Sequence, residues 1–289
     1  MKTPIMTLAA LGLLGAQFAW ADAHSEVEAI SDLLVEDDTG TDPRDFGDKL
    51  MPYYLHTELE NGMEVDQLNL FGFWAITPNW GLTYDMPIVK RVQIDKEDIA
   101  NIVSGEIGTG IEPDELGIKD IDETGLGDLN LRTFVPIGRT GKVTWLAGAE
   151  TNLPTHSDDV LGADVWTAGP MIVDVIDLDF LPMPGAFFAQ MHIFQWDIAK
   201  DSDESSVGMY KGRWFLMVPV HEQWKLYTLT EMQPVYDFYD DEFSFWIAPE
   251  FGKATDWGAV YFKPGFGIDN DQHYDREWTL ELGLRYFFK

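Results

Sequence analysis

The sequence contains no cysteine and few basic residues, with 19 Lys and Arg against 50 Asp and Glu over 289 positions. The absence of cysteine excludes disulfide bonds and thiol chemistry. The formal net charge of −31 argues against a nucleic-acid partner, because an acidic surface repels phosphates. The acidic residues gather in segments that we expect to be loops or an N-terminal extension, where solvated surface is the simplest explanation for them. These segments are Glu26–Asp48, Asp95–Glu123, Asp158–Asp159, Asp197–Glu204, Asp237–Glu242 and Asp269–Asp275.

Long hydrophobic runs are also missing, so no transmembrane helix of about 20 apolar residues is expected. The longest apolar stretch, Leu8–Ala19, follows the basic Lys2 and leads into Ala19-Trp20-Ala21, which has the Ala-x-Ala form of a cleavage site. We therefore expect residues 1–21 to be a cleaved secretory signal peptide. The alternative is an N-terminal anchor, but the run is too short to span a bilayer and ends at acidic residues.

Catalytic and cofactor motifs are absent as well. The six His residues show no metal-ligand spacing, and there is no Gly-x-Ser-x-Gly elbow, P-loop or dinucleotide fingerprint. We expect no cofactor, no metal and no enzymatic activity. One weaker alternative is an outer-membrane acyl hydrolase with Ser157 as nucleophile and His156 as base at the outer rim. Adjacent residues usually point apart, and no third group that would orient the base is visible in the sequence.

The segment with the clearest pattern is Glu277–Phe288, directly before the terminal Lys289. Successive side chains of a strand point to opposite faces. One face is then fully apolar and has aromatic residues at both ends, whereas the other face carries charge. The apolar members are Trp278, Leu280, Leu282, Leu284, Tyr286 and Phe288. This length and alternation are typical of a lipid-facing strand, and the C-terminal position suggests the closing strand of a bacterial outer-membrane β-barrel.

Period-two alternation bounded by turn residues predicts twelve strands, an even number as in bacterial single-chain barrels. The fold class expected is all-β, a transmembrane antiparallel up-and-down barrel over residues 50–289. The predicted strands are Leu50–Glu60, Met63–Thr77, Trp80–Val92, Gly125–Ile137, Lys142–Leu153, Ala163–Ile176, Gly185–Ile198, Gly208–Val220, Gln223–Tyr236, Phe243–Gly252, Trp257–Ile268 and Asp275–Phe288.

Short and long connections alternate along these strands, apart from the tight Asn61-Gly62 hairpin signal. Short periplasmic turns and long outer loops are the expected barrel arrangement, and they place both termini on the periplasmic side. The long segment Gln93–Thr124 either constricts a pore, caps its mouth or is a mobile outer loop. Residues 22–49 are expected to be an acidic periplasmic segment, and the alternative is a plug in the lumen.

If the apolar faces meet lipid, the polar faces line the lumen, and a charge on the lipid face near the midplane would cost about 2–4 kcal/mol. In the third strand this places Thr83, Asp85 and Arg91 inward. The sixth to ninth strands carry large apolar residues on both faces, so part of the lumen would be apolar. Phe71, Phe73 and Tyr227 are candidate inward aromatics. The predicted lumen-lining residues are Asp85, Asp128, Asn130, Arg132, Lys142, Glu150, Lys211, Arg213, Lys225, Glu231, Lys263, Glu281 and Arg285.

These charges, together with Glu250, are expected to form an ionic network. A closed network would brace a filled barrel, whereas a ring with water between its members would tune a channel. Twelve strands lie between the filled eight-stranded barrels and the wide porins, so a narrow pore is geometrically possible.

Two motifs resemble a known family. The first is Thr124-Gly125-Leu126-Gly127-Asp128 at a strand start, and the second is Leu153-Pro154-Thr155 at a strand end before a loop containing Gly162. They resemble the outer-membrane β-barrel porins associated with phenol and meta-pathway degradation, over roughly residues 125–170. The resemblance implies a channel for apolar or aromatic compounds and carries over no catalytic residues. Barrels of this type commonly end in an aromatic residue, whereas here Phe288 is penultimate.

The sequence therefore predicts an outer-membrane channel for passive diffusion of small molecules, exported through a cleaved signal peptide. Its expected partners are outer-membrane lipid, the barrel-assembly machinery and a small-molecule permeant. The alternative is a non-conducting structural or adhesive barrel whose acidic loops meet an outside partner.

Overall fold

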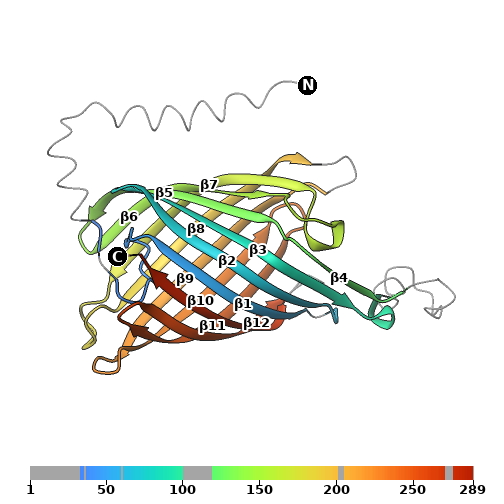
Figure 1. Ribbon diagram of the computed structural model, residues 1–289. Coiled ribbons are helices and arrows are strands. Elements are labelled where there is room, and N and C mark those ends of the chain that lie inside the picture. The colour runs from blue at the N-terminus through green and yellow to red at the C-terminus, as the bar shows by residue number, and fades with distance from the viewer. Residues whose placement is uncertain are drawn as a thin grey trace, which may run out of the picture.

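The computed structural model describes residues 33–35, 37–59, 61–99, 119–200, 205–270 and 276–288, which form a closed barrel of tilted antiparallel strands (Figure 1). The strands are β1 (Lys49–Leu59), β2 (Glu64–Thr77), β3 (Trp80–Ile94), β4 (Ile121–Gly125), β5 (Leu129–Thr140), β6 (Val143–Leu153), β7 (Val165–Asp177), β8 (Phe187–Lys200), β9 (Gly208–His221), β10 (Leu226–Asp237), β11 (Glu242–Thr255), β12 (Gly258–Asn270) and β13 (Arg276–Phe287), with a 3-10 helix η1 at Asp159–Leu161.

Thirteen strand segments make a barrel of twelve strands, because β4 and β5 both pair with β3 and together form one interrupted strand of the wall. The interruption covers residues 126–128, where the backbone N–H of Gly127 donates to the carbonyl of Pro87 at 3.0 Å. Pairing of β1 with both β13 and β2, and of β2 with β3, closes the sheet on itself. The twelve-stranded all-β barrel predicted from the sequence is confirmed.

The remaining differences from the predicted strands occur at turns and bulges. The ninth predicted strand begins at Leu226 rather than Gln223, because residues 222–225 form a tight turn in which Lys225 has a φ of 51°. In β3, a register shift beside Pro87 changes which side chains point inward. Arg91 therefore shares a face with Asp66 and the exposed Leu68, and it pairs with Asp122 at 2.7 Å outside the barrel. The prediction that Arg91 points inward is wrong for this reason.

The predicted alternation of short and long connections is present except between β10 and β11, where residues 238–241 form a turn no longer than that of residues 222–225. Lys49 at the start of β1 pairs with Phe287 at the end of β13, so the strand ends next to both chain termini lie at one end of the barrel. The short turns after β2, β5, β9 and β11, and the longer turn after β7, lie at this same terminal end. The longer connections after β3, β6, β8 and β12 lie at the opposite, loop end. Most of the 93–124 segment and the whole signal-peptide region fall outside the described residues.

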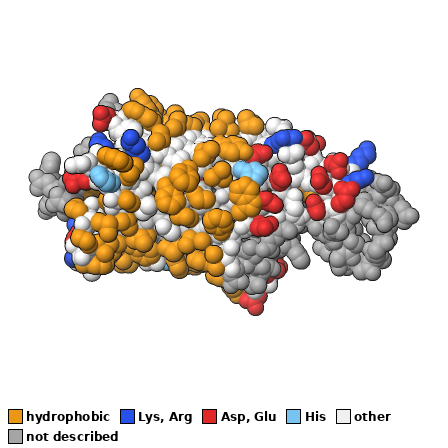
Figure 2. Space-filling model, turned by 90° about the horizontal axis from the view of Figure 1, so that it is seen from below, with side chains coloured by type: hydrophobic (Ala, Val, Ile, Leu, Met, Phe, Trp, Pro, Cys, Tyr) orange, Lys and Arg blue, Asp and Glu red, His pale blue; other side chains and the backbone are white. Residues whose placement is uncertain are grey.

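On the face seen in Figure 2, apolar side chains cover the middle of the barrel, and acidic side chains gather beyond them toward the loop end. Exposed apolar residues on the outer faces include Trp74, Ile76, Val135, Ile137, Phe251, Val260, Phe262, Phe266, Leu282, Leu284 and Tyr286. Apart from Phe251, for which no direction was predicted, they are alternate residues that the sequence placed toward lipid. Such a band is what a barrel needs to sit in a bilayer. Within the described residues, no helix is long and apolar enough to cross a membrane.

Strands β7 and β8 depart from this pattern, because their inner faces are apolar and their outer faces carry polar residues. Met171, Val173 and Ile193 are buried inside the barrel. On the outer face, Asp174 shares a side of β7 with the exposed Ile172, which is the cross-strand partner of His192. His192 Nδ1 lies 2.8 Å from the hydroxyl of Tyr210 and its Nε2 lies 3.7 Å from Asp174. His192 therefore has a hydrogen-bond partner on one ring nitrogen and a carboxylate near the other, where each polar group alone would face an apolar surrounding.

Candidate functional site

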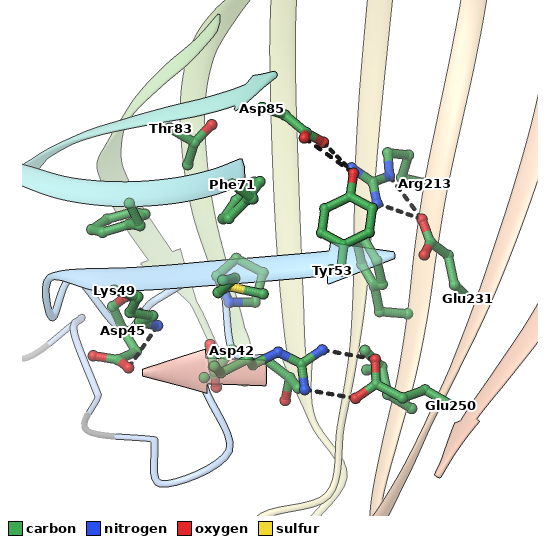
Figure 3. A pocket seen from close by; sticks show the side chains of 18 of the residues that line it. Asp42, Asp45, Lys49, Tyr53, Phe71, Thr83, Asp85, Arg213, Glu231 and Glu250 are labelled. Carbon is green, nitrogen blue, oxygen red and sulfur yellow. Dashed lines mark hydrogen bonds and ion pairs between the residues drawn. The ribbon is translucent and has the colours of Figure 1, made fainter. Parts of the chain in front are cut away.

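The barrel encloses a cavity of about 190 Å³, called here the interior cavity, with an apolar side and an ionic side (Figure 3). The apolar lining comes from Met51, Phe71, Phe73, Phe134, Met191, Phe215 and Leu229. The ionic lining comes from Asp85, Arg132, Arg213, Glu231, Glu250, Lys263, Glu281 and Arg285. The two linings come from strands around the whole barrel, so the cavity exists only in the closed fold.

On the ionic side, Glu231 of β10 is fully buried and holds two cations. Its carboxylate lies 2.7 Å from Arg213 of β9 and 2.9 Å from Lys263 of β12. Lys263 is the cross-strand partner of Glu281 on β13 and also pairs with it at 2.9 Å. A continuous row of alternating charges thus joins four strands. Because each acid is paired and hydrogen-bonded, the row avoids the cost of an isolated buried charge.

Two further acids anchor smaller groups. Glu150 of β6 pairs with its cross-strand neighbour Arg132, accepts a bond from Lys211 at 2.7 Å and accepts another from Gln195 at 2.8 Å. Glu250 of β11 receives two bonds from the guanidinium of Arg285, at 2.6 and 2.7 Å.

The Arg285 guanidinium also lies 4.1 Å from the ring centroid of Tyr261, and the Tyr227 hydroxyl bonds Glu250 at 2.9 Å. Bidentate Arg–carboxylate pairing and stacking on an aromatic ring both hold a guanidinium rigidly. Each of these groups therefore holds its charged side chains in one orientation.

The described part of the N-terminal region, residues 33–35 and 37–48, packs against the inside of the barrel and is called here the inner segment. Phe46 is buried against Phe73 and Phe134, with ring centroids 5.5 and 5.4 Å away. Arg44 is buried and bridges Asp42 at 2.7 Å and Asp177, the last residue of β7, at 2.8 Å. Residues 40–43 and 45 line the interior cavity. The inner segment thus covers the cavity at the terminal end.

The carboxylate of Asp37 organises the turn of the inner segment. It accepts bonds from the backbone N–H groups of Thr39, Thr41 and Asp42 at 2.9, 2.6 and 2.8 Å. Burial alone would raise the pKa of this carboxyl, but the backbone bonds from Asp42 and Thr39 and the charge of Lys49 outweigh it and lower the pKa. The turn is therefore stabilised by an ionised Asp37.

Ten of the thirteen residues predicted to line the lumen lie in strands on the inner face. Seven line the interior cavity directly: Asp85, Arg132, Arg213, Glu231, Lys263, Glu281 and Arg285. Glu150 and Lys211 join it through the pairing of Glu150 with Arg132, and Asn130 lies on the same face as Asp85, its cross-strand partner. Phe71 and Phe73 line the interior cavity, and Tyr227 is buried inside the barrel, where its hydroxyl donates to Glu250.

The other three residues lie at strand ends, away from the inner wall. Lys142 is in the turn before β6 and pairs with the exposed Asp179 at 3.0 Å. Lys225 is in the turn before β10 and reaches the exposed Asp256 at 3.4 Å. Asp128 lies in the interruption between β4 and β5, where it bonds His156 at 2.7 Å. Alternation assigned these residues to strands, whereas Lys142 and Lys225 lie in turns and Asp128 lies in the interruption of its strand.

The proposed hydrolase pair does not come together. The Ser157 hydroxyl accepts a bond from the backbone N–H of Leu126 at 2.9 Å, and Nε2 of His156 lies 3.2 Å from Asp164. A carboxylate, Asp128, does orient the imidazole, and the sequence could not reveal it because the two residues are 28 positions apart. A base for Ser157 would need its nitrogen at hydrogen-bond distance from the hydroxyl. The described contacts give no such pair.

Comparison with solved structures finds the same fold in outer-membrane proteins. The chain is similar to an outer-membrane channel from Pseudomonas putida F1, with a TM-score of 0.59 and 14% identity over 86% of this chain and 100% of that one. It is also similar to the NanC porin, with a TM-score of 0.52 and 10% identity over 84% of this chain and 100% of that one. The fold is that of an outer-membrane β-barrel.

Comparisons of sequence add no family. No model of a protein family matches the chain, and no curated protein matches it. At 10–14% identity the structural likeness shows the fold alone. The association with phenol and meta-pathway degradation therefore stays a prediction.

Proposed function

We propose that the protein is an outer-membrane channel for passive diffusion of small molecules. The observation that carries this proposal is the interior cavity, which has fixed charges on one side and aromatic and aliphatic side chains on the other. A barrel that only needed filling could bury apolar residues throughout, at a lower desolvation cost than charged rows. The similarity to an outer-membrane channel and a porin is consistent with this function.

The two linings suit permeants that are themselves two-sided, namely small aromatic compounds that carry one charged group. The rings of Phe71, Phe134 and Phe215 offer an apolar surface, and Arg132 and Arg213 stand among the ionic lining. Small-molecule sites commonly combine an apolar lining with a few placed polar groups. Such a permeant agrees with the aromatic compounds implied by the family resemblance.

The setting proposed for this function follows from the same features. Residues 1–21 act as a signal peptide, residues 22–49 enter the barrel from the periplasmic side with the inner segment inserted, and residues 50–289 form the barrel. Outer-membrane lipid covers the apolar band, and the barrel-assembly machinery inserts the chain. No catalytic role is proposed.

A flux measurement tests the proposal. We would load liposomes containing the refolded protein with benzoate, benzyl alcohol or glucose, and follow efflux of each compound. Benzoate should leave faster than glucose through the protein. The difference between the two rates should be smaller in a Phe71→Ala variant, which removes one aromatic ring from the apolar lining. Equal efflux from protein-free liposomes and from liposomes with correctly folded protein would refute a channel for these compounds.

A second candidate is a non-conducting structural barrel, and one observation favours it. A buried apolar cluster that includes Phe46, Leu146, Val175 and Phe187 fills part of the interior. If this cluster never opens, the charged rows only brace the wall. Folded protein that passes no solute, even after Phe46→Ala removes a ring from the cluster, would support this candidate over the channel.

A further inference from the structure

Three side chains of types that can bind metal ions lie close together in the connection between β6 and β7, away from the interior cavity. They are His156, Asp159 and Asp164, and their ligand atoms lie within 4.8 Å of one another. The His156 side chain is only 6% exposed, whereas Asp164 and Asp159 are more open to solvent. The imidazole is thus a buried group, and two carboxylates reach it from the surface.

The orientation of His156 is fixed by a fourth side chain, Asp128. One oxygen of Asp128 lies 2.7 Å from Nδ1 of His156 and accepts bonds from the N–H groups of Thr155 and His156, at 3.1 and 3.2 Å. The other oxygen accepts a bond from the N–H of Ala163 at 3.0 Å. Both oxygens of Asp128 are engaged, so this carboxylate positions the ring and leaves Nε2 directed toward Asp164, which lies 3.2 Å from it.

The loop is shaped to allow this close approach. A Cβ on Gly162 would lie 2.3 Å from Nδ1 of His156 and 2.6 Å from Oδ1 of Asp128. Any larger residue at this position would push the imidazole or the carboxylate away. The absence of a side chain at position 162 is therefore part of how the His156–Asp128 pair is held.

We propose that His156, Asp159 and Asp164 form a binding site for a divalent transition-metal ion such as Zn²⁺, with Asp128 as the residue that positions His156. One imidazole nitrogen and carboxylate oxygens are a donor set that Zn²⁺ accepts, whereas Ca²⁺ uses oxygen ligands only. A carboxylate on the second ring nitrogen is the usual partner of a metal-binding His. Closing the cluster around an ion requires a small side-chain movement, which the exposed Asp159 on η1 allows.

The site would hold the loop end of the barrel together. Asp128 lies in the interruption between β4 and β5, and the three ligands lie between β6 and β7. An ion bound at His156 Nε2 would link the β6–β7 connection to the interruption between β4 and β5, through the His156–Asp128 pair. Three protein ligands also leave coordination positions open for water or for a group from outside.

The test uses the refolded full-length protein in detergent micelles, stripped with a chelator and titrated calorimetrically with Zn²⁺ alone. We expect one saturable site. His156→Ala and Asp164→Asn should each weaken binding at least about tenfold, and Asp128→Asn should weaken it about 10–100-fold while all three ligands remain. Gly162→Ala should also weaken binding. His221→Ala, which removes an exposed His at the terminal end of the barrel, is the matched control and should leave the affinity unchanged.

X-ray absorption at the zinc edge provides a second readout, with one nitrogen ligand from imidazole and the remainder oxygen. Heat-modifiable gel mobility establishes that each variant is folded, so a loss of binding reports on the site. The proposal is overturned if the folded wild-type protein shows no saturable binding. It is equally overturned if His156→Ala binds Zn²⁺ as tightly as wild type, because the acidic surface alone would then account for the binding.

Discussion

At the scale of single residues, Glu231 is a fully buried carboxylate that pairs with both Arg213 and Lys263. Glu231→Gln keeps the shape of the side chain but removes the carboxylate that pairs with Arg213 and with the buried Lys263. Removing one member of a buried ion pair typically costs about 3–5 kcal/mol, so we expect a loss of that order in the free energy of unfolding. Urea unfolding in lipid vesicles measures it. Glu64→Gln, at an exposed position on β2, should change stability by less than about 0.5 kcal/mol.

Charges in the interior cavity and charges on the surface should differ in their effect on ion selectivity. Arg132→Gln removes a positive charge from the lining of the interior cavity, whereas Lys225→Gln removes one from an exposed turn. In a salt gradient across a planar bilayer, the reversal potential should shift toward cation selectivity in Arg132→Gln and stay at the wild-type value in Lys225→Gln. A shift of equal size in both variants would mean that the interior charges do not set selectivity.

The sequence was informative about side-chain direction wherever strands alternate cleanly. Glu281 and Arg285 on β13 were assigned inward from alternation alone, and both line the cavity. Alternation failed for Arg91, because a bulge shifts the pattern by one residue, and for Lys225, because the turn extends further than its residues suggest. Pair partners such as Glu150 and Lys211 could not be predicted, since they lie 61 positions apart and meet only once the barrel closes.

At the scale of elements, the inner segment is held by a turn that a single substitution can weaken. Asp37→Asn removes the charge that accepts three backbone bonds, so the turn at residues 37–42 should loosen. We expect faster proteolysis before β1 in this variant and a larger flux of benzoate. Thr57→Ser, a mild change at a buried position of β1, is a control that should alter neither.

The lowered pKa of Asp37 predicts that acid also loosens the turn of the inner segment. A folded-state pKa below the ordinary carboxyl value of 3.8 means that the contribution to stability is fully present above about pH 4 and is lost as pH falls through the lowered value. Proteolysis before β1, measured with an acid-active protease, should therefore accelerate below about pH 4 in wild type. Asp37→Asn should lack this step, and an identical acid step in the variant would assign the release to another group.

The sequence predicted the strands but not how the inner segment packs inside the barrel. The residues of the inner segment lack a clear period, so the sequence left a periplasmic segment and a lumen plug as alternatives. The choice depends on contacts with Phe73, Phe134 and Asp177, which come from three separate strands. Strands β7 and β8 were ambiguous for a physical reason, because large side chains occupy both of their faces.

At the scale of the whole molecule, the barrel combines an apolar outer band with a partly filled, charged interior. The number of strands, and the position of the first and last strand ends at one end of the barrel, followed from alternation and connection lengths. How far the interior is filled could not be predicted from the sequence, because it depends on how side chains from many strands share the interior volume. We propose that this interior conducts solutes when the inner segment leaves the cavity open.

Single-channel recording in a planar bilayer tests that claim most directly. Refolded wild-type protein should give discrete ohmic steps, and Phe46→Ala, which removes a ring from the contact of the inner segment with Phe73 and Phe134, should give larger steps. A silent bilayer with both proteins, each shown to be folded by heat-modifiable gel mobility, would contradict the channel and leave a barrel braced shut by its interior charges.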